Sequence, residues 1–131
     1  MARHWVMRVT YAFSTALISV FPHVGQGDAY AALIGTMLRQ LGDRDPEAMA
    51  QIAAALGITG VQASGVPGRI AESMEMVFGS LGMATRLSRL GIEREQLPQV
   101  LEISLRNFNA DPKREFVKER ERLGKILESA W

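Results

Sequence analysis

The sequence has 131 residues and a formal net charge of +1, with fifteen Lys or Arg against fourteen Asp or Glu. This length predicts a single domain, residues 1–131, and the balanced charge gives no electrostatic reason to expect a nucleic-acid partner. The chain contains no cysteine, which excludes a disulfide framework, a thiolate metal site and a cysteine nucleophile.

The first apolar segment, Trp5–Phe21, is apolar nearly all round, which predicts a helix in the middle of a bundle. Arg3 and Arg8 precede its apolar run and loosely resemble the start of a secretory signal, but no small-x-small cleavage site follows. The run is also shorter than the ~20 residues that a membrane span needs, and it contains serine and threonine. We therefore expect a buried helix in a cytoplasmic protein that makes no membrane contact.

The stretch Phe21–Asp28 separates this helix from a second one, Ala29–Gln40. Pro22 cannot continue a helix, two glycines open conformations that other residues avoid, and Asp28 is expected to cap the second helix. The break contains His23, one of two histidines in the chain. This imidazole could keep a metal or ligand contact in a pocket between the two helices. Alternatively, it is a loop histidine that hydrogen-bonds a backbone group.

Further helices are expected along the rest of the chain. A capping Asp45 followed by Pro46 and Glu47 predicts a helix start, and Gly57 predicts its end. The other predicted helices are Pro67–Leu81, a short Arg86–Leu90, Leu97–Arg106 and Phe116–Ala130; Gly82 is expected to end the first of these and Gly91 the second. Five side chains of Pro67–Leu81 are expected to face the core: Ile70, Met74, Val77, Phe78 and Leu81. No alternating β-branched run indicates a sheet. The fold class is therefore expected to be all-α, a bundle of about six helices.

Other candidate sites each have a plain structural alternative. Glu72 and Glu75 lie three residues apart on a predicted helix and could form a carboxylate pair, or they are two acids on a solvated face. The methionines could line a small-molecule pocket or fill the core: Met37, Met49, Met74, Met76 and Met83. Five cations could bind an anionic partner or belong to a solvated helix face: Lys113, Arg114, Lys118, Arg120 and Arg122. Gly25-x-Gly27 lacks the third glycine and the preceding strand of a dinucleotide-binding loop.

The stretch Leu81–Ile92, followed by Gln96-Leu97-Pro98, resembles the C-terminal helical domain of iron-containing (group III) alcohol dehydrogenases. In that family a Leu-Gly-x-Pro-Thr-Arg-Leu turn precedes a Gly-Val/Ile … Leu-Pro helix start. The Asn107–Pro112 loop, the terminal Leu127–Trp131 and the Pro22-His23 pair match as well, so the resemblance runs from about Val9 to Trp131. It implies a helical bundle like the C-terminal domain of dehydroquinate synthase and iron-containing alcohol dehydrogenases, without the N-terminal nucleotide-binding domain.

In that family the first half binds NAD(P), and the helical half holds Fe2+ or Zn2+ with an Asp and three His. His23 matches the last of these ligands, and the family ligand before it falls near Val9. A further family histidine, often assigned a catalytic role, falls near Phe13, and the Asp and first His come from an earlier helix that this chain lacks. His4 lies too close to the start and out of register. A stable site of this kind needs three or four ligands, and this chain offers His23 with Asp28 as a second. We expect no catalytic residue, no cofactor on the isolated chain, and His23 as the remnant of a degenerate metal site.

The leading functional hypothesis is a free-standing helical domain that is not catalytic alone and acts as an interaction or small-molecule-binding module. We expect a homodimer that pairs the apolar wall of Trp5–Phe21 and the His23 loop, which the missing nucleotide domain would leave exposed. The alternative is the metal-binding half of an NAD(P)-dependent alcohol dehydrogenase, completed by a separate nucleotide-binding chain. A third alternative is a gene remnant with no selected activity.

Overall fold

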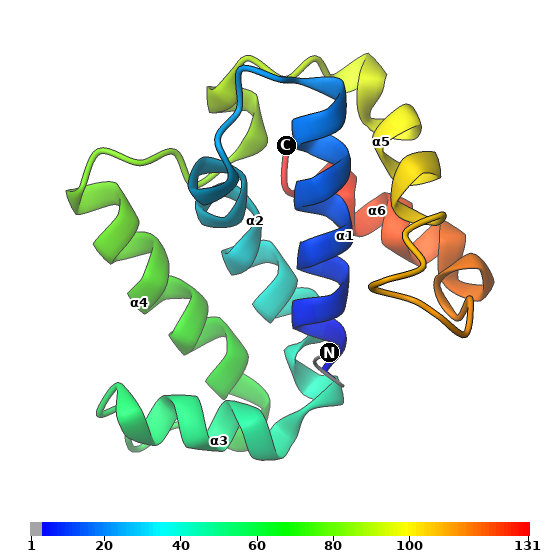
Figure 1. Cartoon of the computed structure of the whole chain (residues 1–131). Helices are drawn as coiled ribbons and strands as arrows, with labels where there is room; N and C mark the ends of the chain where they lie inside the picture. Colours follow the sequence, from blue (N-terminus) through cyan, green and yellow to red (C-terminus); the bar gives the residue numbers. More distant parts are fainter. Residues whose placement is uncertain (1–3) are drawn as a thin grey trace.

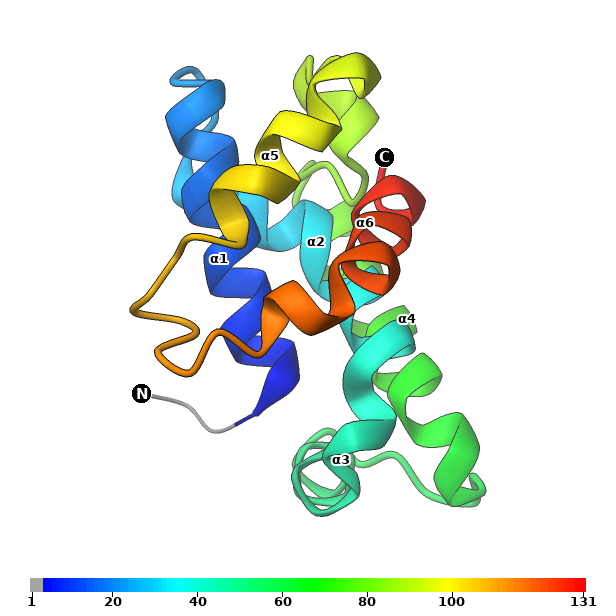
Figure 2. The same cartoon turned by 90° about the vertical axis from the view of Figure 1, so that its right-hand side faces the viewer.

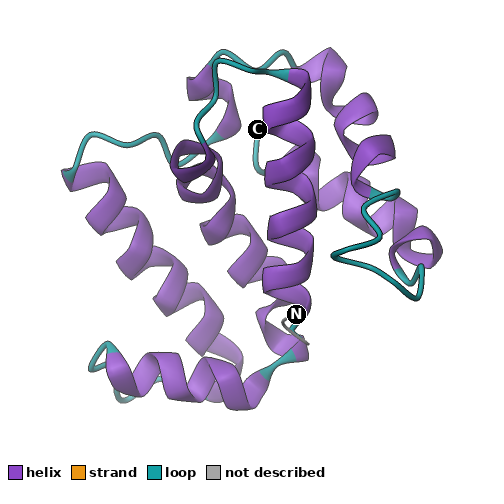
Figure 3. Ribbon diagram, in the orientation of Figure 1, coloured by secondary structure: helices purple, strands orange, loops and turns teal. Residues whose placement is uncertain are grey.

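The structure, a computed structural model, describes residues 4–131, and this part of the chain consists of helices and connecting loops with no strand (Figure 3). The α-helices are α1 Trp5–Val20, α2 Gln26–Leu41, α3 Pro46–Ala55, α4 Val66–Ser80, α5 Leu97–Ser104 and α6 Arg120–Ser129. Short 3-10 helices connect them: η1 Gly42–Arg44, η2 Ala63–Gly65, η3 Leu87–Leu90, η4 Arg94–Gln96 and η5 Phe116–Glu119. The predicted all-α fold is confirmed. None of the helices in residues 4–131 is long and apolar enough to cross a membrane.

Helix α1 occupies the centre of the molecule, with α2 packed on one side and α5 on the other (Figure 1). Helix α6 packs against α5 and α2, while α4 lies along the opposite flank of α2. Helix α3 crosses the start of α4, and these two helices lie away from α5 in both views (Figure 2). The bundle therefore has a thick part around α1 and a thinner part formed by α3 and α4.

The core is made by side chains from every part of the bundle. The largest side chains that are fully buried are Phe13, Phe116, Leu17, Leu33, Met37, Leu41, Ile70, Leu87, Leu123, Leu127, Val9 and Val100. Because α2 and α5 cover the apolar face of α1, the expectation that this face lies exposed is wrong. The His23 loop, in contrast, is exposed as expected.

Two predicted caps differ from the structure. Helix α2 begins at Gln26, with Gly25 as its N-cap, so Asp28 lies inside the first turn instead of capping it. A carboxylate in the first turn still interacts favourably with the positive end of the helix dipole, so Asp28 stabilises α2 from this position. Asp45 is the N-cap residue of α3 and precedes Pro46 as predicted, but it makes no side-chain cap hydrogen bond. Its Oδ1 instead lies 2.6 Å from Nδ1 of His4.

A buried arginine joins α1 to the segment between α5 and η5. Arg8 donates from Nε to the carbonyl of Ala110 at 2.9 Å and from Nη2 to Oδ1 of Asp111 at 3.0 Å. Asp111 is 1% exposed, and its carboxylate also accepts the backbone N–H groups of Glu115 and Phe116 at 2.8 and 2.7 Å. Both buried charges are thus compensated by partners, as buried ions require.

Stacked cations and aromatic rings hold the same end of α1. The Arg44 guanidinium of η1 lies 4.4 Å from the centroid of the Trp5 ring, and that of Arg8 lies 5.1 Å from it. Arg44 also donates two hydrogen bonds to Glu119 of η5. This hydrogen-bonded pair lowers the pKa of Glu119 and raises the pKa of Arg44 from their ordinary values. The start of α1, the connection from α2 to α3, and η5 are therefore held together.

Candidate functional site

His23 lies in the exposed loop between α1 and α2 and contacts a distant part of the chain. Its Nε2 is 2.9 Å from the backbone carbonyl oxygen of Leu90 at the end of η3. Because a carbonyl oxygen can only accept a hydrogen bond, Nε2 of His23 must carry the hydrogen and donate it. The ring also meets Phe21 edge-on, at 6.1 Å between centroids. This is the contact anticipated for a loop histidine that bonds a backbone group, and the role of His23 as a metal ligand stays a prediction.

The acceptor of His23 is held in place by the end of the chain. The backbone N–H of Leu87 donates to the carbonyl of Ala130 at 2.9 Å, and that of Ser88 donates to Trp131 at 3.0 Å. The indole Nε1 of Trp131 donates to the carbonyl of Ile92 at 2.9 Å. These contacts join η3, the segment that follows it and the C-terminal residues into one unit. The position of His23 therefore depends on residues up to 108 places away along the chain.

The side chains around His23 do not fit a metal centre. Val9 and Phe13, at the positions where the family resemblance places histidines, are buried hydrocarbon in the core. His4 lies at the other end of α1 and is engaged by Asp45. Within residues 4–131 no group of three or more His, Cys, Asp or Glu is arranged to hold a metal ion. A divalent iron or zinc needs three or four protein donors, so the described side chains around His23 do not fit such a metal.

The candidate carboxylate pair on α4 is divided between two arginines. Glu72 pairs with Arg69 at 2.9 Å on the surface of α4, whereas Glu75 reaches across to Arg39 of α2, with N···O distances of 3.1 and 2.5 Å. The hydrogen bond from Arg39 to Glu75 raises the pKa of that arginine. Each carboxylate therefore neutralises its own cation, and the two do not work as an acid–base pair.

The other candidates from the sequence separate into core and surface. Met37 and Met49 are buried, Met74 packs partly against the core, and Met76 is exposed. The five cations between Lys113 and Arg122 are all exposed. Arg120 pairs with Glu102, and Arg122 donates to the carbonyl of Gln40 at 2.9 Å. Arg114 lies over the ring of Phe108 at 5.3 Å.

The second half of α4 carries an exposed apolar surface that the sequence did not predict. The exposed fractions are 74% for Met76, 56% for Val77 and 69% for Leu81, the residue that follows the helix. The prediction that Val77 and Leu81 point into the core is therefore wrong, whereas Ile70 on the same helix is fully buried. The reason is visible in Figure 1, where the end of α4 extends away from α1 and α2 toward the loop that leads to η3.

Comparison with known proteins agrees with this fold. The sequence profile described as "Fe-containing alcohol dehydrogenase family, C-terminal" matches residues 8–131. The chain belongs to this family. The match covers all but the first seven residues, and the resemblance inferred from Leu81–Ile92 is confirmed. No match was found among the curated proteins or among the solved structures. As a member of the Fe-containing alcohol dehydrogenase family, the chain has the helical C-terminal fold.

Proposed function

We propose that this domain of the Fe-containing alcohol dehydrogenase family acts as a helical interaction module and does not hold a catalytic metal on its own. The observation that carries this proposal is the exposed apolar surface of Met76, Val77 and Leu81, hereafter the α4 surface. An exposed apolar patch on a helix usually marks a contact with another protein. Among residues 4–131, by comparison, no group of three or more metal-binding side chains surrounds His23.

The partner that best fits the α4 surface is a second copy of this chain. Residues 76–85 contain no ionisable side chain, although charged residues make up 22% of the sequence. Two copies can therefore face each other across this segment without like-charge repulsion, and a two-fold axis makes such a contact self-complementary. A strongly charged partner, in contrast, finds no group here with which to form an ion pair.

The size of the α4 surface limits how strongly two copies can associate through it. Complete burial of an aliphatic or Met side chain contributes about 1.5–3 kcal/mol, and these three residues are about two-thirds exposed. Two copies together then gain roughly 6–12 kcal/mol, against an association cost of about 4–15 kcal/mol. The largest surplus that these ranges allow is about 8 kcal/mol, which corresponds to a dissociation constant of about a micromolar, so we expect self-association through this surface to be weak and reversible.

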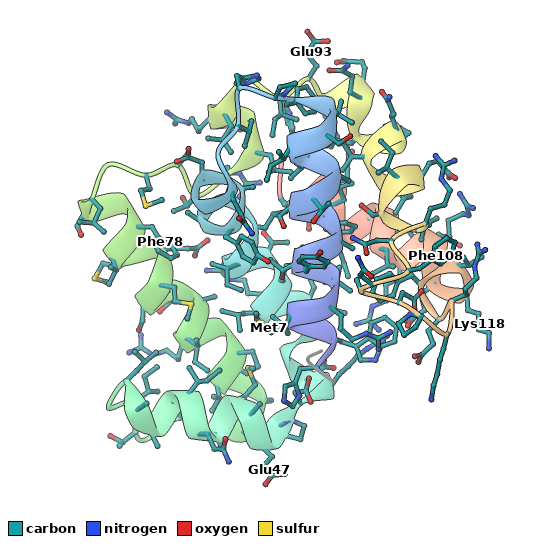
Figure 4. The ribbon with its side chains drawn as sticks, viewed as in Figure 1. Met7, Glu47, Phe78, Glu93, Phe108 and Lys118 are labelled. Carbon is teal, nitrogen blue, oxygen red and sulfur yellow. The ribbon has the colours of Figure 1, made fainter. Side chains whose placement is uncertain are left out.

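Sedimentation equilibrium over a range of concentrations tests this proposal. The wild-type chain is expected to self-associate, and Met76→Glu is expected to remain monomeric because it places like charges at the contact. Phe108→Glu is the matched control, since Phe108 is exposed and lies on the other side of α1 from α4 (Figure 4). A monomeric wild-type chain at millimolar concentration, or association unaffected by Met76→Glu, would reject the dimer.

A catalytic assay tests the other part of the proposal. Purified chain is mixed with Fe2+ or Zn2+, NAD(P)+ and a set of primary alcohols, and the formation of reduced cofactor is followed. We expect no turnover above the buffer control. Robust turnover by the purified chain would show that it is an enzyme by itself and would reject the proposal.

The second candidate function is the metal-binding half of an NAD(P)-dependent alcohol dehydrogenase that a separate nucleotide-binding chain completes. The exposed position of His23 favours it, because a second chain could supply the missing donors there. Co-purification of such a chain, with metal retained only in the complex, would support this function. Equal metal retention by His23→Ala in that complex would count against it.

A further inference from the structure

A small cavity lies on the α3 side of the molecule, separate from the His23 loop. It has a volume of about 250 Å³ and is formed where η1 and the start of α3 meet η2 and the start of α4. Of the nine residues that line it, only Asp43 and Ser64 have polar side chains. An apolar cavity of about 150 Å³ holds a benzene molecule, so this one has room for a ring with a short side chain.

The walls of the cavity combine stiff and adaptable groups. Pro46 and Pro67 lie in the first turns of α3 and α4, and their rings fix the two helix starts that form the walls. Gly42 allows η1 to pack closely against α3 and α4. A Cβ atom at this position would lie 2.8 Å from Cβ of Pro67 and 3.2 Å from the sulfur of Met49. The thioether of Met49 can adjust to a ligand and makes favourable contacts with aromatic rings.

The polar part of the cavity favours a positive charge. Asp43 is exposed and forms no hydrogen bond or ion pair within residues 4–131, although its charge, after the hydrogen bond to Glu119, contributes to the raised pKa of the neighbouring Arg44. The neighbouring Arg44 is engaged by Glu119 and Trp5, and no Lys or Arg lines the cavity. Among the described residues, Asp43 is the one charged residue in the lining, so an ammonium group at the mouth is favoured over an anion.

We propose that this cavity binds a small aromatic amine, with the ring between Pro46, Met49 and Pro67 and the ammonium group beside Asp43. The cavity lies at the first turn of α4, about ten residues or ~15 Å along the helix from the α4 surface. Amine binding and self-association are therefore separate properties, and each can fail without the other. For a ligand of about nine non-hydrogen atoms we expect a dissociation constant on the order of a millimolar.

The test uses three compounds of similar shape and different charge: 2-phenylethylamine, 2-phenylethanol and phenylacetate. Titrations are followed by the NMR signal of the Met49 methyl group, and affinities are compared by calorimetry. The amine is expected to shift the Met49 signal saturably and to bind about threefold more tightly than the alcohol, as a solvent-exposed charge pair allows. Phenylacetate is expected to bind most weakly.

Two variants separate the contribution of charge from that of shape. Asp43→Asn is expected to reduce the affinity for the amine to that for the alcohol, while Glu93→Gln leaves it unchanged. Glu93 is an exposed acid at the end of the molecule opposite α3 (Figure 4), so its replacement is the matched control. Ala50→Leu places a larger side chain on an exposed turn of α3 that lines the cavity, and it is expected to abolish binding of all three compounds.

Circular dichroism of each variant establishes that it is folded before it is titrated. Phenylacetate binding as tightly as the amine would overturn the proposal. So would full amine affinity in Asp43→Asn, Met49 shifts that persist in Ala50→Leu, or no saturable shift with any compound.

Discussion

Replacement of Arg8 with methionine is expected to lower the free energy of unfolding by about 3–5 kcal/mol, the usual cost of removing one partner of a buried ion pair. Arg8 is 9% exposed and Asp111 1% exposed, so Asp111 would keep its charge in the interior without a cation. The variant also loses the hydrogen bond to the carbonyl of Ala110 and the stacking of Arg8 on the rings of Trp5 and Phe116. The two backbone N–H groups that bond Asp111 remain and limit the loss.

Thermal and urea unfolding, followed by circular dichroism, measure this loss. For a chain of this size, it corresponds to a decrease in Tm of roughly 10–20 °C. Arg69→Met is the control, because Arg69 pairs with Glu72 on the surface with side chains 54% and 58% exposed. That variant is expected to lose about 0.5 kcal/mol or less.

A double-mutant cycle with Asp111→Asn separates the pair from its surroundings. Because both charges are removed together, the double variant is expected to be more stable than the sum of the single losses predicts. Arg8→Met within about 1 kcal/mol of the wild type, or additive losses in the cycle, would refute the view that this pair stabilises the fold.

Three further predictions concern the turns and the surface. Gly42→Ala is expected to destabilise the fold by about 1–3 kcal/mol, since its Cβ would collide with a proline of α4, while Gly79→Ala, with open space around it, is expected to add about 0.5–1 kcal/mol. Equal changes in the Tm of these two variants would contradict the packing argument. Because Arg44 lowers the pKa of Glu119, the folded state binds this proton less readily than the unfolded state. The ion pair should therefore stabilise above about pH 4.5 and lose this effect as the pH falls through the lowered pKa. In urea titrations, the free energy of unfolding of Glu119→Gln should depend less on pH in that acid range than that of the wild type. An unchanged dependence would contradict a stabilising role for the Arg44–Glu119 pair. His23→Ala is expected to cost about 1 kcal/mol through the lost hydrogen bond to η3, and hydrogen exchange at η3 should increase; unaltered exchange would exclude this coupling.

Local sequence signals predicted where the helices end. Gly57, Gly82 and Gly91 were each expected to end a helix, and all three have a positive φ between 71° and 75°. A residue with a side chain rarely adopts this conformation, so a glycine after an apolar helical pattern is a local and reliable signal. The starts of α1, α3 and α5 were predicted correctly at Trp5, Pro46 and Leu97. The start of α2 was misplaced, because several residues near a helix start can serve as the cap.

Contacts between residues far apart in the chain could not be predicted from the sequence. In the sequence, Arg8 is a charged residue in front of an apolar run. Nothing near it indicates that Asp111, 103 residues later, neutralises its charge. In the same way the break around His23 was predicted, but its acceptor at Leu90 was not. The apolar pattern of α4 identified a face without indicating what covers it, so Val77 and Leu81 were assigned to the core. Periodicity describes one helix, whereas burial depends on where its neighbours end.

The two tryptophans of this chain lie in separate parts of the bundle, and each ring lies beneath an arginine. Trp5 is stacked by Arg44 at 4.4 Å near the start of α1, and Trp131 by Arg94 at 5.5 Å beside Ile92. Intrinsic fluorescence therefore combines two local signals that can be resolved with single-tryptophan variants. Trp5→Phe would leave an emission that reports on the C-terminal residues, and Trp131→Phe one that reports on the first turn of α1. Such a pair of variants would tell whether the two ends of the bundle melt together or in sequence.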